Sequence, residues 1–242
     1  MPGVQQRLPS LLDPPIAFAH RGARAHAQEN TIEAFALGLR LGATGLESDV
    51  WLTSDGIPVL DHDGVVRARL RSRPISTLRR DQLPTHVPAL TDLIEACGTD
   101  YHLSLDMKDH DAAATVVRVV REAAPDLLGR LWLCYRDWRL AAEFRVLDPD
   151  VRLVDSTRLS RMKEGAERRA ASLASAGIDA VNLHQSDWTG GLTTLFHRFD
   201  RYAFAWDAQH ERVLQSLLRM GVDAVYSDWV DRMTDAFREE VG

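Results

Sequence analysis

The sequence lacks the features that mark several classes of protein. It has only two cysteines, Cys97 and Cys134, which are too few for a disulfide framework and match no zinc motif in their spacing. No apolar run approaches the roughly 20 residues that a membrane-spanning helix requires. The N-terminal stretch holds no apolar segment of the kind found in a signal peptide. These absences predict a protein of a reducing, cytoplasmic compartment without stable membrane insertion.

Positive charge is not in excess either. Lys and Arg number 29 against 35 Asp and Glu, which leaves a formal net charge of -6. A chain of this balance has no electrostatic footprint for nucleic acid or for an anionic membrane surface. The sequence therefore favours a small-molecule partner, and because no apolar stripe marks an interface it leaves the oligomeric state open.

What the chain does contain is a regular alternation of strands and helices. Its 242 residues, 45% of them hydrophobic, suffice for one large domain. Short β-rich runs alternate with amphipathic stretches, which predicts a parallel sheet. Setting run 57–62 aside as a hairpin extension leaves eight units, close to the roughly 250 residues of a (β/α)8 barrel. The eight predicted strands are 16–20, 45–52, 102–108, 131–135, 151–156, 180–184, 202–207 and 224–228.

The α/β barrel domain should span 16–242, preceded by an N-terminal extension over 1–15 and interrupted by an irregular, Arg- and Pro-rich insertion at about 63–88. The alternative is a doubly wound open sheet. That fold usually has a Gly-rich turn after its first strand, and the turn that follows His20 lacks the second and third glycines of the motif. Asn30 and Glu33 resemble a capping box at the start of the first helix.

Acidic side chains gather where the predicted strands end, which is where a barrel carries its active site. Because strand side chains alternate, Glu47 and Asp49 face one side, as do Asp106 and Lys108 on the next strand. Three converging carboxylates repel one another unless a cation lies among them. Oxygen ligands suit one divalent cation, Mg²⁺ or Ca²⁺. The alternative is that solvent or nearby arginines neutralise these acids.

Two histidines, His20 and His62, also follow strand ends, and histidine can transfer protons near neutral pH. Arg21 and Lys108 lie beside these groups in the predicted barrel. Two proton carriers, two cations and a metal together provide the acid, the base and the charge neutralisation that cleavage of a phosphate ester requires.

These motifs, in this order and nearly this spacing, resemble the glycerophosphodiester phosphodiesterase family from Ile16 to Asp228. The resemblance implies a single-domain TIM barrel of the PLC-like phosphodiesterase type. It rests on His20-Arg21-Gly22, Glu29-Asn30-Thr31, Glu47-x-Asp49, Thr53-x-Asp55-Gly56 and His62-Asp63, with weaker matches at Asp106-Met107-Lys108, Trp206 and Ser227-Asp228.

The resemblance also implies an activity and a role for each matched residue. Family members hydrolyse glycerophosphodiesters to glycerol 3-phosphate and an alcohol. The implied roles are acid-base catalysis by His20 and His62, contacts to the phosphate and substrate from Arg21, Lys108, Glu29 and Trp206, and metal binding by Glu47, Asp49 and Asp106. Which histidine is the base stays open.

Three departures from the family pattern leave other functions open. Gln28 replaces a proline, Asp106 a glutamate, and Asp207-Ala208-Gln209 the usual Thr-Val-Asn. One alternative is a phospholipase-D-like enzyme acting on lysophospholipids or sphingolipids. Another is a binding homologue with impaired catalysis, which the changes at Asp106 and Asp207 motivate. The preferred head group and the native metal stay open.

Overall fold

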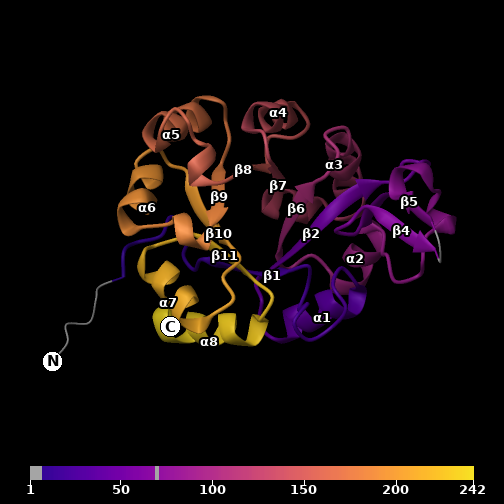
Figure 1. Ribbon diagram of the computed structural model, residues 1–242, viewed down its shortest axis with the longest axis horizontal. Coiled ribbons are helices and arrows are strands. Elements are labelled where there is room, and N and C mark those ends of the chain that lie inside the picture. Colours follow the sequence, from indigo (N-terminus) through magenta and orange to yellow (C-terminus); the bar gives the residue numbers. More distant parts are fainter. Residues whose placement is uncertain (1–6, 69–70) are drawn as a thin grey trace.

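Eight parallel strands close into a barrel in the computed structural model, which describes residues 7–68 and 71–242 (Figure 1). Consecutive strands pair in parallel around the ring, and β1 pairs with both β2 and β11, which closes it. This confirms the predicted (β/α)8 fold and excludes an open doubly wound sheet. The barrel strands are β1 (Ile16–His20), β2 (Gly45–Leu52), β6 (His102–Met107), β7 (Leu131–Tyr135), β8 (Arg152–Ser156), β9 (Ala180–His184), β10 (Tyr202–Trp206) and β11 (Ala224–Ser227).

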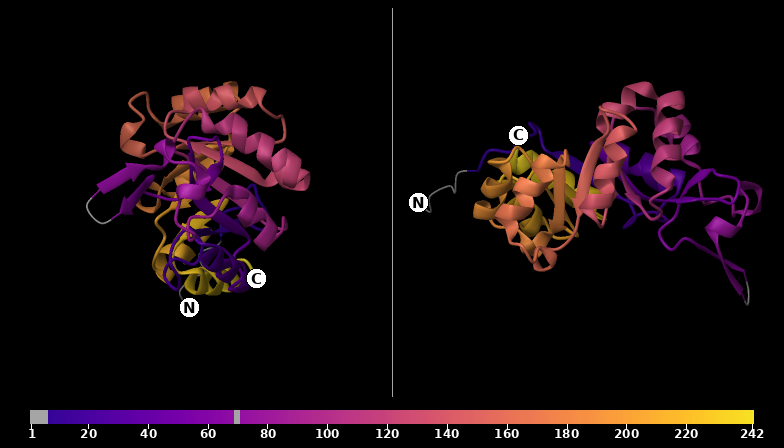
Figure 2. Two further views of the ribbon diagram at one scale, coloured as in Figure 1. Left: turned by 90° about the vertical axis from the view of Figure 1, so that its right-hand side faces the viewer. Right: turned by 90° about the horizontal axis from the view of Figure 1, so that it is seen from above.

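Helices surround the barrel on the outside (Figures 1 and 2). None of those within 7–68 and 71–242 is long and apolar enough to cross a membrane. The α-helices are α1 (Ile32–Arg40), α2 (Leu90–Cys97), α3 (Ala112–Ala123), α4 (Trp138–Glu143), α5 (Ala166–Ser175), α6 (Gly190–His197), α7 (Glu211–Arg219) and α8 (Val230–Glu240). Short 3-10 helices span Ile75–Thr77, Arg80–Gln82, Pro125–Arg130, Phe144–Val146, Leu159–Arg161 and Gln185–Asp187.

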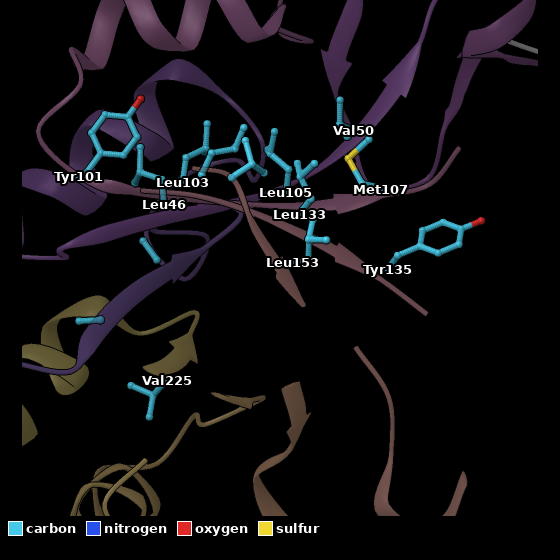
Figure 3. Close-up of a cluster of buried hydrophobic side chains, with 14 of the residues drawn as sticks. Leu46, Val50, Tyr101, Leu103, Leu105, Met107, Leu133, Tyr135, Leu153 and Val225 are labelled. Carbon is cyan, nitrogen blue, oxygen red and sulfur yellow. The ribbon is translucent and has the colours of Figure 1, made fainter. Parts of the chain in front are cut away.

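The two faces of each strand belong to different layers of the core. Leu46, Val50, Leu105 and Met107 face the helices and belong to the large apolar cluster between barrel and helices, part of which Figure 3 shows. This is the alternation that the sequence predicted. The opposite face of the same strands points into the barrel, so every polar residue at those positions borders the interior.

Aromatic rings fill the lower part of the barrel interior. Phe18 stacks on Tyr226 with ring centroids 4.6 Å apart, and Trp132 meets Phe204 edge-on at 4.8 Å. All four are almost completely buried. We call these four rings the aromatic plug.

The described part of the N-terminal extension crosses the amino end of the barrel. The buried carboxylate of Asp223 accepts hydrogen bonds from the backbone N–H groups of Leu11, at 2.5 Å, and Leu12, at 3.0 Å. Leu12 packs against the apolar interior of the barrel. Positions 1–6 of the predicted extension lie outside the described residues.

The predicted insertion is more ordered than its composition suggested. β3 (Pro58–Leu60) pairs antiparallel with β2, as expected of the hairpin extension. Within 63–88, β4 (Val65–Ala68) and β5 (Arg71–Pro74) form a further hairpin at the edge of the molecule (Figure 1). Scattered apolar residues of the insertion build a small core of their own; it comprises Val59, Ile75, Leu78, Leu83, Val87 and Ala89. The prediction of an irregular segment was therefore wrong in part, because Arg and Pro residues separate the apolar residues of this core in the sequence.

The predicted capping box at the first helix is wrong. Thr31 is the N-cap, and its hydroxyl accepts from the backbone N–H of Ala34 at 3.2 Å. Asn30 instead accepts a hydrogen bond from the buried Ser48 hydroxyl at 2.7 Å and adopts a left-handed backbone with φ 55°. Asn30 thus ties the loop after β1 to β2.

Candidate active site

A cavity of about 270 Å³ opens at the carboxyl ends of the barrel strands. Every residue that the sequence assigned to the site lines it except Glu29. The predicted residues on its wall are His20, Arg21, Glu47, Asp49, His62, Asp106, Lys108 and Trp206. Ser104, Cys134, Ser156, Asn182 and Tyr226 also line the cavity, and sequence reasoning missed all of them.

A tight turn after β1 aims the first motif at the cavity. Arg21 and Gly22 both have positive φ, 53° and 79°. A Cβ on Gly22 would lie 2.6 Å from the Ala34 carbonyl carbon, so the close approach to α1 requires glycine here. The turn directs the Arg21 backbone N–H to Glu47, to whose Oε2 it donates at 3.0 Å.

The carboxylates of β2 and β6 share one cation. Asp49 and Asp106 are paired in register on adjacent strands. Lys108 Nζ lies 2.7 Å from Asp49 Oδ1 and 2.5 Å from Asp106 Oδ2, and so bridges the two. Arg21 Nε is 3.2 Å from Asp49 Oδ2 but is not aligned to donate, so this buried oxygen has no hydrogen bond.

Negative charge is incompletely compensated at this edge of the cavity. Burial, together with the charge of Asp49, raises the pKa of Glu47 to about 7. Burial also raises the pKa of Asp106, against the attraction of Lys108. Burial alone would lower the pKa of Lys108, but the charges of Asp106 and Asp49 outweigh it and raise that pKa. Burial therefore holds Glu47 and Asp106 closer to their protonated forms than free carboxyl groups.

No group of three or more His, Cys, Asp or Glu side chains within residues 7–68 and 71–242 is placed to hold a metal ion as it stands. Lys108 occupies the space between two of the predicted ligands. The donors nevertheless fit a hard divalent cation by their chemistry, since they are carboxylate oxygens and one of them, Asp49 Oδ2, is buried without a hydrogen bond.

His20 is held by an acid from the opposite end of the chain. Its Nδ1 lies 2.6 Å from Asp228 Oδ1, and its Nε2 lies 3.8 Å from Glu47 Oε2. Burial lowers the pKa of His20, but the charge of Glu47 and the hydrogen bond to Asp228 outweigh it and raise that pKa above its usual value. Asp228 therefore orients the ring, with Nε2 on the side of Glu47. Its position just after the last strand was the signal that could have shown this.

His62 and Glu29 differ in their position relative to the cavity. The His62 side chain is 41% exposed, and its Nδ1 lies 3.0 Å from Asp63. Glu29 contacts the guanidinium of Arg21 with both carboxylate oxygens at 3.3 Å, so it supports Arg21 from outside the cavity wall. Glu29 does not line this cavity, so its contact with substrate stays a prediction.

Trp206 forms part of the cavity wall, as the resemblance implied. Its ring meets His184 edge-on at 4.6 Å, and the Arg158 guanidinium lies 5.6 Å from the ring centroid. Asp207 is not among the residues that line the cavity. Its carboxylate lies 3.1 Å from His184 Nε2 and accepts a hydrogen bond from Gln209 Nε2 at 3.2 Å, so it contacts neighbouring side chains instead of the cavity.

Comparison with known proteins identifies relatives across nearly the whole barrel. The family model described as "Glycerophosphoryl diester phosphodiesterase family" matches residues 20–232. The Bacillus subtilis protein YhdW is 27% identical over 240 residues, which cover 88% of this chain and 94% of that protein. Mouse glycerophosphodiester phosphodiesterase 1 is 31% identical over 137 residues, 49% of this chain, but the match covers only 41% of the mouse protein.

Solved structures share the fold at lower identity. A glycerophosphodiester phosphodiesterase from Thermotoga maritima superposes with a TM-score of 0.78 at 21% identity, covering 91% of this chain and 97% of that one. A phosphodiesterase from Oleispira antarctica superposes with a TM-score of 0.80 at 23% identity, covering 93% and 97%. These likenesses agree with the barrel topology.

Proposed function

Because the chain belongs to the glycerophosphoryl diester phosphodiesterase family, we propose that it hydrolyses small glycerophosphodiesters to glycerol 3-phosphate and a free alcohol. One observation carries the proposal: the cations Arg21 and Lys108 line the same cavity as the histidines His20 and His62. The structure of the Oleispira antarctica phosphodiesterase is described as a complex with the product sn-glycerol-3-phosphate, which supports the same product here.

We propose a role for each of these groups. The two cations would bind the phosphate oxygens and offset the charge that grows on them as the attacking hydroxyl adds to phosphorus. One histidine takes the proton of that hydroxyl, which comes from water or from the substrate's own glycerol. Attack by the glycerol hydroxyl would first give a cyclic phosphate, which water would then open to glycerol 3-phosphate. The other gives a proton to the alkoxide that leaves when the second phosphorus–oxygen bond breaks. Asp228 holds the His20 ring in place for either role.

We also propose that one divalent cation, Mg²⁺ or Ca²⁺, belongs to the site. Glu47 and Asp49 would hold it, with Asp106 as the third candidate ligand. Support comes from the unpaired buried oxygen of Asp49 and from the raised pKa of Glu47. When bound, such an ion supplies positive charge at the phosphate and at these carboxylates. A cytoplasmic location is a further part of the proposal, in keeping with two free cysteines.

The test is hydrolysis by the purified protein. Glycerophosphocholine, glycerophosphoethanolamine, glycerophosphoglycerol and lysophosphatidylcholine would each be incubated with Mg²⁺, Ca²⁺, Mn²⁺ or a chelator, and the products identified. We expect glycerol 3-phosphate from the first three and no turnover with chelator. Products from lysophosphatidylcholine alone would establish the phospholipase-D-like alternative, and no hydrolysis with any metal would establish a binding homologue.

A variant locates the activity in the cavity. His62→Ala should abolish turnover while leaving the melting temperature unchanged, because the ring is 41% exposed and supports little packing. His86→Ala is the matched control, since His86 is exposed and does not line the cavity. Wild-type rates in His62→Ala would remove His62 from the mechanism.

A further inference from the structure

One side of the cavity carries a polar group that the proposed chemistry leaves unused. Asn182 on β9 is 6% exposed and lines the cavity, and its side-chain Oδ1 is buried without a hydrogen-bond partner. An unpaired buried acceptor costs about 1–3 kcal/mol. A buried group of this kind in a native protein calls for an explanation, and a role in binding is one.

The neighbouring polar groups on the cavity floor are satisfied by one another. The Ser104 hydroxyl lies 3.0 Å from the Tyr226 hydroxyl and 3.3 Å from the Cys134 sulfur. Asn182 is paired in register with Ser156 on β8, whose side chain also lines the cavity. Asn182 and Ser156 therefore form one polar wall, separate from the paired groups beneath it.

The polar wall lies across the barrel from the charged groups. In the ring of eight strands, β9 is four positions from β2, which carries Glu47 and Asp49, and β8 is four positions from β1, after which Arg21 follows. An anionic phosphate held by Arg21 and Lys108 would thus lie on one side, and its substituent would extend toward Asn182.

The chemistry of Asn182 selects the substituent that fits. The Asn182 side chain offers an acceptor oxygen and an N–H2 donor group. A phosphodiester anion could pair only with the N–H2 group, because it has no donor of its own for the oxygen. A hydroxyl-bearing substituent supplies donors, whereas an alkyl substituent would leave the oxygen unpaired. We propose that Asn182, with Ser156 beside it, binds hydroxyl groups of the glycerol moiety and so selects polyol phosphates over alkyl phosphates. This inference rests on the proposed function for the identity of the polyol.

The test compares two ligands that differ only in hydroxyl groups, sn-glycerol 3-phosphate and propyl phosphate, by titration calorimetry. We expect the wild-type protein to bind glycerol 3-phosphate about 5- to 150-fold more tightly, the range set by leaving a buried acceptor unpaired. Asn182→Leu, which keeps the branched shape and the number of heavy atoms but replaces the amide oxygen and nitrogen by methyl groups, should bind both ligands with similar affinity. Its affinity for propyl phosphate should stay within about threefold of wild type. Ser156→Ala should shift the preference in the same direction by a smaller factor.

The fold of the variant can be checked independently. Because Asn182→Leu removes an unpaired buried oxygen, its melting temperature should equal or exceed that of wild type. Thr193→Val is the matched control, since Thr193 is a buried polar residue on α6 that does not line the cavity. This control should keep the wild-type preference.

The inference and the proposed function fail in different ways. A preference for glycerol 3-phosphate that survives in Asn182→Leu would overturn the inference, whether or not glycerophosphocholine is hydrolysed. Equal weakening of both ligands in that variant would also overturn it, because Asn182 would then act on the phosphate or on the fold. A preference that Asn182→Leu abolishes, in a protein that hydrolyses no glycerophosphodiester, would support the inference and refute the proposed function.

Discussion

The base of the barrel contains a histidine whose burial should make the fold sensitive to acid. His102 begins β6, is half-buried, and its Nδ1 accepts a hydrogen bond from Trp132 Nε1 at 3.2 Å. Burial, reinforced by the charge of Arg130, lowers the pKa of His102 from 6.5 to about 4. The neutral ring is therefore part of the folded structure.

The sign and size of the effect follow from linkage. The unfolded chain takes up a proton on this ring near pH 6.5, and the folded protein does so only near pH 4, so stability is present above pH 6.5 and is lost as the pH falls through that window. The full shift corresponds to about 3 kcal/mol. Because the ring retains contact with solvent, we expect about 1.5–2 kcal/mol.

The experiment is urea denaturation at pH 7 and pH 4.5. His102→Asn keeps an acceptor for Trp132 and cannot take up the proton, so its unfolding free energy should fall between the two pH values by about 1.5–2 kcal/mol less than that of wild type. His86→Asn, at an exposed position, should behave as wild type. Equal losses in His102→Asn and wild type would refute the reasoning.

Two further changes test the site and its supporting turn. Asp228→Asn should lower kcat/KM about 10- to 150-fold, because a hydrogen bond to a charged partner is worth about 1.5–3 kcal/mol. Asp231→Asn serves as its control in the same assay, because Asp231 pairs with His26 at 3.1 Å and does not line the cavity. Equal rates in the two variants would remove Asp228 from the site. Gly22→Ala should lower the unfolding free energy by about 1–3 kcal/mol, because position 22 has a positive φ and a Cβ there would contact α1. Thermal or urea denaturation would measure this loss. An unchanged stability would show that the turn relaxes freely.

The eight barrel strands were predictable because burial acts on them uniformly. Each is a short apolar run followed by an amphipathic stretch, and the closed topology buries both faces of the runs. The β4–β5 hairpin was not predictable in the same way. Val66 packs against a small local core whose members are scattered between Val59 and Ala89, and such a core leaves no periodic signal in an Arg-rich segment.

The site was predictable where charged residues stood at strand ends and less so where polar residues stood within strands. Glu47, Asp49 and Asp106 interrupt apolar runs and so attract notice. Asn182 lies in the middle of AVNLH, and its role depends on the strand register, which no single strand reveals. Glu29 illustrates the opposite case, since its motif position was visible but its contact with Arg21 depends on the turn after β1.

On strands that contribute to the site, an interior side chain that is apolar is followed, two residues later, by one that is polar. This sequence pattern explains why a sequence can locate such a site. On β1 the buried ring of Phe18 gives way to His20, and on β9 the buried Ala180 gives way to Asn182. Residues two apart face the same side, so on each of these two strands the polar side chain follows the apolar one along the interior face, toward the carboxyl end. Apolar packing of the aromatic plug stabilises the fold, while Asp49 Oδ2 and Asn182 Oδ1, which are buried and accept no hydrogen bond, reduce stability. A ligand that donates hydrogen bonds to those oxygens should therefore raise the melting temperature. Propyl phosphate offers no donor to Asn182, so it should raise the melting temperature less than glycerol 3-phosphate when the phosphate contacts of both ligands are equally occupied.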